Sequence, residues 1–271
     1  MSTAKEKLSN MFAKVMAGTV TREEGTMLLN HMAKEDLVGT ITELSYLLEN
    51  PPPNVFPKTI LHTIALTKNK AFFNIVVASL NHKNEDVCIL AAEELARQRT
   101  DDARHVLIEQ LSNEAYHIRK ASAAALAKGF GKAGTDILTK HILSHPEQFF
   151  RDTSAYGLVL SGAGGITALI ELLNSGSPAA ASTAASALAE ASAQIKNEHL
   201  PKIFGALLGA GDRKDSQTII VLLKLIAALR HRAQSFEGCV LAFKDYPFEP
   251  VRHEAENTLK QLRPAAEPAS E

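Results

Sequence analysis

The sequence lacks most of the features that identify a function directly. It contains no tryptophan, two cysteines, and 29 basic against 30 acidic residues over 271 positions. Because the charges cancel, we expect no general attraction to nucleic acid or to a membrane surface. The cysteines, Cys88 and Cys239, are far apart in apolar surroundings. This placement favours two buried thiols over a disulfide.

Long apolar segments are also missing. Polar residues interrupt every hydrophobic run well before the roughly 20 residues that a bilayer requires. The opening MSTAKEKLSNMF has no apolar core of the kind found in secretory signals. Hydrophobic residues nevertheless make up 45% of the chain and charged residues 22%, as in ordinary folded proteins. We therefore expect a cytoplasmic protein with no membrane partner.

A nine-residue pattern recurs along the chain. Its first position is apolar or small, its fifth and eighth positions are mostly small, and its ninth is leucine. It appears in VCILAAEEL (87–95), IRKASAAAL (118–126), FRDTSAYGL (150–158), AASTAASAL (180–188) and VRHEAENTL (251–259), and more loosely in FPKTILHTI (56–64) and QTIIVLLKL (217–225). The last positions of the seven segments are 31, 31, 32, 30, 37 and 34 residues apart. Such a period is typical of stacked helical repeats.

A second amphipathic segment precedes most copies of the pattern, such as DARHVLIEQL and GITALIELL. Apolar residues within both kinds of segment are three or four positions apart, which indicates helices. Turn sequences such as ENPPPN (49–54) and SGAGG (161–165) separate them. The sequence therefore predicts an all-α fold, a right-handed α-solenoid of about seven two-helix repeats over residues 36–262.

The two ends differ from the repeats. Leu8, Met11, Phe12 and Val15 predict one amphipathic helix, and Thr21 with Glu24 predicts a capping box that opens a second. We interpret residues 1–35 as a helical hairpin, which either covers the end of the solenoid or docks a partner. Residues 263–271, RPAAEPASE, are expected to be a disordered tail.

The pattern resembles the short HEAT repeats of phycobilin lyase subunits and of deoxyhypusine hydroxylase, most closely at 118–126 and 251–259. This resemblance implies a fold and no single function. For deoxyhypusine hydroxylase it implies several His-Glu pairs that together hold two irons. Only His253-Glu254 is present here, and the matching positions are Ile89-Leu90, Lys120-Ala121, Asp152-Thr153 and Ser182-Thr183. One pair cannot supply such a site, so we expect no metal, no cofactor and no enzymatic activity.

The segment GFGKAG (Gly129, Gly131, Gly134) matches the glycine spacing of dinucleotide-binding loops. Such a loop must follow a strand and open a helix. Here a helix precedes it, so we interpret the glycines as a helix end and a turn. The ten histidines form no recognisable catalytic grouping in the sequence.

The third and seventh positions of the pattern are expected to face a concave surface, where repeat proteins bind their partners. The candidate binding residues are Glu93, Arg119, Lys120, Arg151, Asp152, Tyr156, His253 and Asn257. Arg119, Arg151 and Arg252 share the second position, where a ladder between repeats is the simplest interpretation. A surface with both charge signs and an aromatic residue favours a protein partner. The leading hypothesis is a scaffold or regulatory adaptor.

Two questions stay open at this point. Arg119, Lys120, Lys128, Lys132 and Lys140 form a basic cluster within residues 119–141, with Asp136 as its one acid. The alternative function is therefore nucleic-acid binding through this cluster. The apolar helix predicted at 217–229 belongs either to the core or to a dimer interface, and we favour the core in a monomeric protein.

Overall fold

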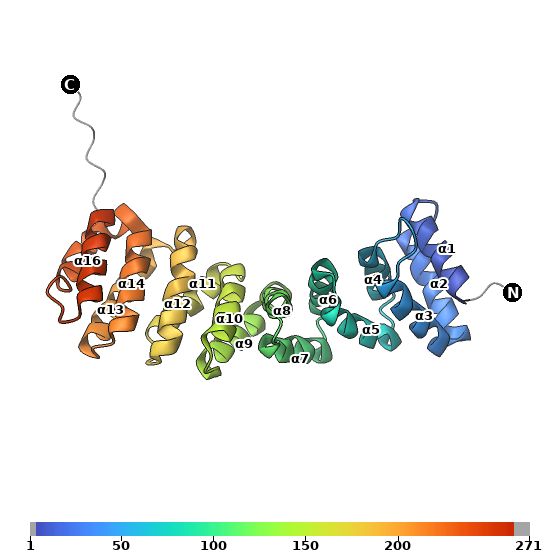
Figure 1. Ribbon diagram of the computed structural model, residues 1–271, viewed down its shortest axis with the longest axis horizontal. Helices are drawn as coiled ribbons and strands as arrows, with labels where there is room; N and C mark the ends of the chain where they lie inside the picture. Colours follow the sequence, from blue (N-terminus) through green and yellow to red (C-terminus); the bar gives the residue numbers. More distant parts are fainter. Residues whose placement is uncertain (1–3, 263–271) are drawn as a thin grey trace, which may run out of the picture. The chain divides into compact units, whose positions relative to one another are not determined.

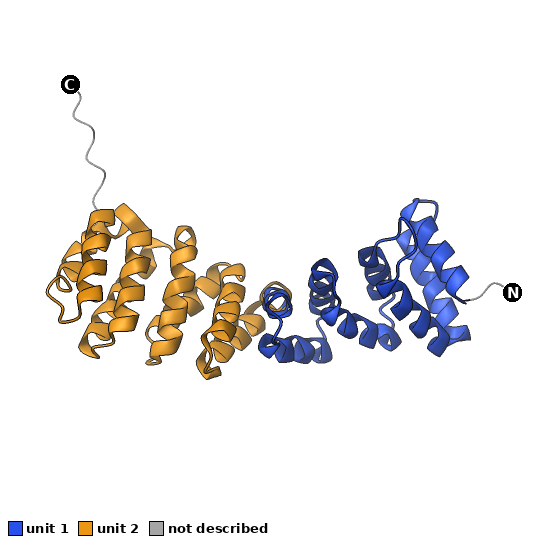
Figure 2. Ribbon diagram, viewed as in Figure 1, with its two compact units in different colours: residues 1–125 blue, residues 126–271 orange. Residues whose placement is uncertain are grey.

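The structure is a computed structural model that describes residues 4–262. Over that range the chain forms helices and turns, without a strand. The all-α repeat fold predicted from the sequence is confirmed. The chain divides into two compact units, residues 1–125 and 126–271 (Figure 2), and the boundary falls inside helix α8 (Tyr116–Gly129).

The first unit is a series of consecutive helix pairs (Figure 1). Helix α1 packs against α2 and α3, and α4 packs against α3 and α6. The helices before α8 are α1 (Ala4–Met16), α2 (Arg22–Glu35), α3 (Leu37–Glu49), α4 (Pro57–Leu66), α5 (Phe73–Ala78), α6 (Glu85–Gln98) and α7 (Asp101–Glu109).

The second unit has two layers. Helices α10, α12, α14 and α16 lie side by side, each packed on the next, and α9, α11 and α13 form the other layer (Figure 1). The bounds are α9 (Gly131–Ser144), α10 (Gln148–Leu160), α11 (Ala163–Leu173), α12 (Pro178–Glu190), α13 (Leu200–Asp212), α14 (Ser216–Leu229), α15 (Glu237–Leu241) and α16 (Glu249–Leu262). Stacked helix pairs of this kind bury a core that no single pair could build. None of the helices within residues 4–262 is long and apolar enough to span a bilayer.

The nine-residue pattern is explained by burial in the second helix of each repeat. The five residues at its fifth position are Ala91, Ser122, Ser154, Ala184 and Ala255, and all have 0% exposed surface. Small side chains are needed there because neighbouring helices approach closely. The leucines at the ninth position are also buried, whereas the third and seventh positions are exposed or half-buried.

The capping box predicted at the start of α2 is confirmed. The Thr21 hydroxyl accepts a hydrogen bond from the Glu24 backbone N–H at 3.2 Å, and the Glu24 carboxylate accepts one from the Thr21 backbone N–H at 2.8 Å. These bonds satisfy two donors that the first helical turn would leave unpaired.

Helix α14 contains the apolar segment whose environment the sequence left open. Its residues Ile219, Leu222, Leu223, Leu225 and Ile226 are buried. The contacts come from α12, α13 and α16, so this helix belongs to the core of the second unit. The wider spacing before it arises from two short 3₁₀ helices, η4 (Ser192–Gln194) and η5 (Asn197–His199), between α12 and α13.

The arginines at the second position of the pattern share one contact within their own repeats. Each uses Nη1 to donate to two backbone carbonyls, five and six residues earlier, in the loop before its helix. Arg119 donates to Asn113 at 2.7 Å and Glu114 at 2.9 Å, Arg252 to Tyr246 at 2.8 Å and Pro247 at 3.0 Å, and Arg151 to His145 at 3.0 Å and to Pro146. The contact common to all three arginines is therefore a clamp on the loop, and Arg151 also reaches the next repeat through the Thr183 hydroxyl. The clamp supplies these loop carbonyls with a charged donor.

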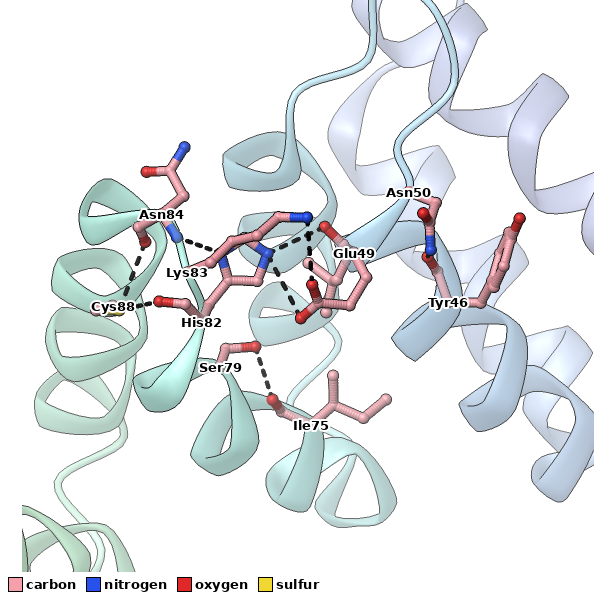
Figure 3. Close-up of polar contacts among 10 residues, drawn as sticks. Tyr46, Glu49, Asn50, Ile75, Ser79, His82, Lys83, Asn84 and Cys88 are labelled. Atoms are coloured by element: carbon pink, nitrogen blue, oxygen red, sulfur yellow. Dashed lines mark hydrogen bonds and ion pairs between the residues drawn. The ribbon is translucent and has the colours of Figure 1, made fainter.

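In the first unit Cys88 occupies the same second position (Figure 3). Its thiol donates to the carbonyl oxygen of His82, again six residues earlier, at 2.9 Å. Burial raises the pKa of this thiol, which keeps it protonated and able to donate. The His82 ring lies against the end of α3, since Nδ1 accepts from the Asn84 backbone N–H at 2.9 Å and Nε2 lies 3.3 Å from the Leu48 carbonyl oxygen.

The clamp predicts a large loss of stability on Arg119→Met. Methionine keeps an apolar stem but leaves two loop carbonyls without their charged donor, so the free energy of unfolding should fall by about 2–3 kcal/mol. Urea denaturation measures this value. Lys128→Met, an exposed position on the same helix, should change it by less than about 0.5 kcal/mol. Equal effects of the two substitutions would contradict the clamp.

Candidate interaction site on the second helices

A polar cavity of about 420 Å³ lies in the second unit, at the N-terminal ends of α10, α12 and α14. These are the second helices of three successive repeats, so a single ligand in the cavity would contact all three. The lining residues are Gln148, Arg151, Pro178, Ala179, Ser182, Thr183, Ser186, Asp215, Gln217, Thr218 and Val221.

Capping residues fix the two helix ends that enclose the cavity. Ser177 caps α12, its hydroxyl accepting from the Ala180 backbone N–H at 3.3 Å. Asp215 caps α14 in the same way, with Oδ1 3.2 Å from the Thr218 backbone nitrogen. The Thr218 hydroxyl lies 3.5 Å from the Pro178 carbonyl oxygen and links the two helices. Helix N-termini carry partial positive charge, so hydrogen-bond acceptors are favoured beside them.

Arg151 is the central charged group of this site. The residue is only 7% exposed. Its Nη1 clamps the loop before α10, and its Nε donates to the Thr183 hydroxyl on α12 at 3.3 Å. The third guanidinium nitrogen, Nη2, takes part in no hydrogen bond among the described residues. Arg151 lines the cavity, so an acceptor that enters it meets a guanidinium group with unused N–H donors.

Asp215 contributes the opposite charge. Its Oδ1 is used in the cap of α14, whereas its Oδ2 is buried and has no hydrogen-bond partner within residues 4–262. A buried carboxylate oxygen without a donor is costly. The cavity is therefore lined by one residue with an unused donor, on α10, and by one with a buried, unsatisfied acceptor, before α14.

A further carboxylate, that of Asp152, interacts with Arg151. Although Asp152 is an exposed residue, desolvation of its carboxyl group by the surrounding protein raises its pKa. The neighbouring Arg151 charge opposes this rise, and Glu190 adds to it. Acidic groups therefore accompany Arg151 here, with Asp152 next to it and Asp215 in the lining of the same cavity.

The candidate binding residues fall into two groups. Glu93, Asp152, Tyr156 and His253 are exposed, and Lys120 and Asn257 are half-buried, so all six side chains reach the surface of their second helices. Arg119 and Arg151 differ because their guanidinium groups point toward the preceding loops and donate to loop carbonyls. The two residues are only 4% and 7% exposed. Of the eight residues, Arg151 is the one that lines the cavity.

Sequence reasoning missed the remaining cavity residues. Ser182 and Ser186 occupy the third and seventh positions of AASTAASAL, and the rule applied to the other repeats would have included them. Asp215 and Gln217 precede or begin α14, where the repeat spacing stretches. No signal in the sequence places these two residues beside Arg151.

The other sequence motifs do not form sites in the structure. His253 is exposed and Glu254 half-buried on α16, and no group of three or more His, Cys, Asp or Glu among residues 4–262 could hold a metal ion. The glycine motif joins α8 to α9, two helices. Gly134 is required because a Cβ there would lie 2.1 Å from the Leu126 carbonyl oxygen.

One serine–histidine pair does form, between α9 and α10. The Ser154 hydroxyl lies 2.9 Å from Nδ1 of His141, a spacing found in nucleophilic catalysis. Ser154 has no exposed surface, so a substrate cannot reach it. Burial, and secondarily the neighbouring His145, lowers the pKa of His141 to about 4. We interpret this pair as part of the core.

Comparison with known proteins agrees with the fold. Residues 41–159 match the family model of HEAT repeats. The HEAT-type repeats predicted from the nine-residue pattern are therefore confirmed. No curated protein matches the sequence.

Several solved structures resemble this chain. Human deoxyhypusine hydroxylase in complex with glycerol is 14% identical over 96% of each chain, with a TM-score of 0.38. A designed armadillo repeat protein is 17% identical over 70% of this chain and all of its own, with a TM-score of 0.37. Importin beta is 16% identical over 94% of this chain and 43% of its own, with a TM-score of 0.45. No activity or partner is inferred from these similarities.

The His141 environment predicts a pH-dependent stability. The unfolded chain binds a proton at this ring below about pH 6.5, whereas the folded chain does so only near pH 4. The unfolded state thus binds more protons in this window, and the free energy of unfolding should fall as the pH is lowered through it. Urea denaturation at several pH values measures this slope. His141→Gln should flatten it, and His105→Gln, at an exposed position, should leave it unchanged; equal slopes in all three proteins would contradict this assignment.

Proposed function

We propose that this chain is a cytoplasmic protein-interaction module, of the scaffold or adaptor type and without catalytic activity. Its partner is a protein that binds the exposed face of the second helices α10, α12 and α14. The observation that carries this proposal is the polar cavity shared by three successive repeats. A site built from one residue set per repeat suits an extended partner segment, because such a segment can follow the stack.

The composition of this face supports a protein partner. Tyr156 is 38% exposed on α10, and aromatic side chains of this kind contribute strongly to protein interfaces. Ser182 and Ser186 on α12 supply hydroxyl groups, and Val221 on α14 supplies an apolar surface. The combination offers a contact of mixed polarity.

The nucleic-acid alternative receives less support from the same residues. Arg119 is buried in its loop clamp, so its charge is not presented to a phosphate. Asp152 interacts with both Arg151 and Glu190, and Asp215 lines the cavity. A polyanion would be repelled by these carboxylates.

The test is capture of binding proteins by the wild-type chain and by Tyr156→Ala. If Tyr156 belongs to the interface, its truncation should weaken partner binding at least about tenfold in a protein that is still folded. Leu143→Ala is the matched control, since Leu143 is 50% exposed on α9 in the other layer. A partner that binds both variants equally would place the interface elsewhere.

A salt titration of the captured complex separates the two functions. A protein interface of mixed polarity should weaken only a few-fold between 50 and 200 mM salt, estimated roughly. Binding of DNA phosphates by Lys128, Lys132 and Lys140 would weaken on the order of 40-fold over the same range. That steeper dependence, with recovered nucleic acid, would overturn the proposed function.

A further inference from the structure

We propose that the cavity at the N-terminal ends of α10, α12 and α14 binds a neutral carboxamide group of the partner. The guanidinium of Arg151 would donate to the carbonyl oxygen of this group, and Asp215 would accept from its N–H. This inference rests on the proposed function and identifies the chemistry of its partner.

The donor side of the site is already held in place. Arg151 is bound through Nε and Nη1 to Thr183, His145 and Pro146, so its side chain has little freedom left to lose. A ligand carbonyl that meets Nη2 therefore avoids most of the entropic cost of ordering an arginine. Thr183 itself is buried and also lines the cavity.

The acceptor side has an unmet requirement. Oδ2 of Asp215 is buried without a donor, and the same residue lines the cavity. An N–H group entering from the cavity would supply the missing hydrogen bond. The cost of the unpaired oxygen is then removed on binding, which favours the bound state.

The two charges together select against charged ligands. A carboxylate or phosphate suits Arg151 but is repelled by Asp215, and Asp152 is the neighbour of Arg151 in the sequence. An ammonium or guanidinium suits Asp215 but is repelled by Arg151. A carboxamide is neutral and has both a carbonyl acceptor and an N–H donor. It therefore satisfies both sides without a repulsive contact.

A carboxamide of the partner has two sources, the side chain of Asn or Gln and the main chain of an extended segment. Four probes distinguish them in NMR titrations that follow the Val221 methyl groups, which lie at the cavity. The probes are the N-acetyl methylamides of glutamine, alanine, glutamate and lysine. We expect saturable binding with dissociation constants on the order of millimolar.

The order of the affinities gives the result. If the glutamine probe binds more tightly than the other three, the ligand is a side-chain carboxamide. If all four probes bind with equal affinity, the ligand is a main-chain amide. Tightest binding of glutamate or lysine, or no saturable binding of any probe, would overturn the proposal. If no probe binds but a protein partner still depends on Tyr156, the proposed function stands and the carboxamide site is lost. If a probe binds but no such partner is found, the carboxamide site stands and the proposed function is lost.

Asp215→Asn tests the acceptor directly. Asparagine has nearly the same shape and caps helices equally well, but it can present an NH₂ donor where Oδ2 was. We expect the favoured probe to bind at least tenfold more weakly, with the melting temperature unchanged or raised. Asp212→Asn removes the same charge at an exposed position nearby and should bind as the wild type does.

A second variant keeps the test valid if Asp215→Asn does not fold. Ser186 is exposed on α12 and lines the cavity, so Ser186→Trp should fill the site without disturbing the cap of α14. Probe binding should be lost in this variant. Unchanged binding in either folded variant would overturn the carboxamide site.

Discussion

The fold depends on the fact that no helix pair in it can bury its own apolar face. Each second helix must approach its neighbours closely on both sides, which explains the fully buried small residues at the fifth position, such as Ala91, Ala184 and Ala255. The loop before each second helix has carbonyl groups that lie outside the helical hydrogen-bond pattern, and these need other donors, from water or from side chains.

The second position of the pattern meets that need. Arg119, Arg151 and Arg252 each donate to two loop carbonyls, and the Cys88 thiol lies within hydrogen-bond distance of two, those of His82 and Asn84. The chemistry of the donor varies between repeats, whereas its target six residues earlier does not. Ala181 occupies this position in α12 and has no side-chain donor. Helix α12, which has alanine at this position, also supplies five of the residues that line the cavity.

Arg151 connects the architecture to the proposed site. Its bonds to the loop and to Thr183 would exist for structural reasons alone. A guanidinium has five N–H donors in a fixed plane, so one group can hold a loop, contact the next helix and still offer a donor to a ligand. An ordered arginine beside an unsatisfied Asp215 oxygen is a site whose polar groups are positioned before the ligand arrives.

Much of the architecture follows from the sequence alone, because helix period and repeat spacing are local properties of the chain. The 31-residue period, the capping box at Thr21 and Glu24, and the exposed third and seventh positions could all be predicted. Tertiary structure decided the rest. In the folded chain, Arg119 and Arg151 are buried and bind their own loops instead of lying on the surface. Helix α14 lies in the core of the second unit, and Asp215 lines the same cavity as Arg151. These outcomes depend on which groups lose contact with water when helices stack, and that is set by neighbours distant in the sequence.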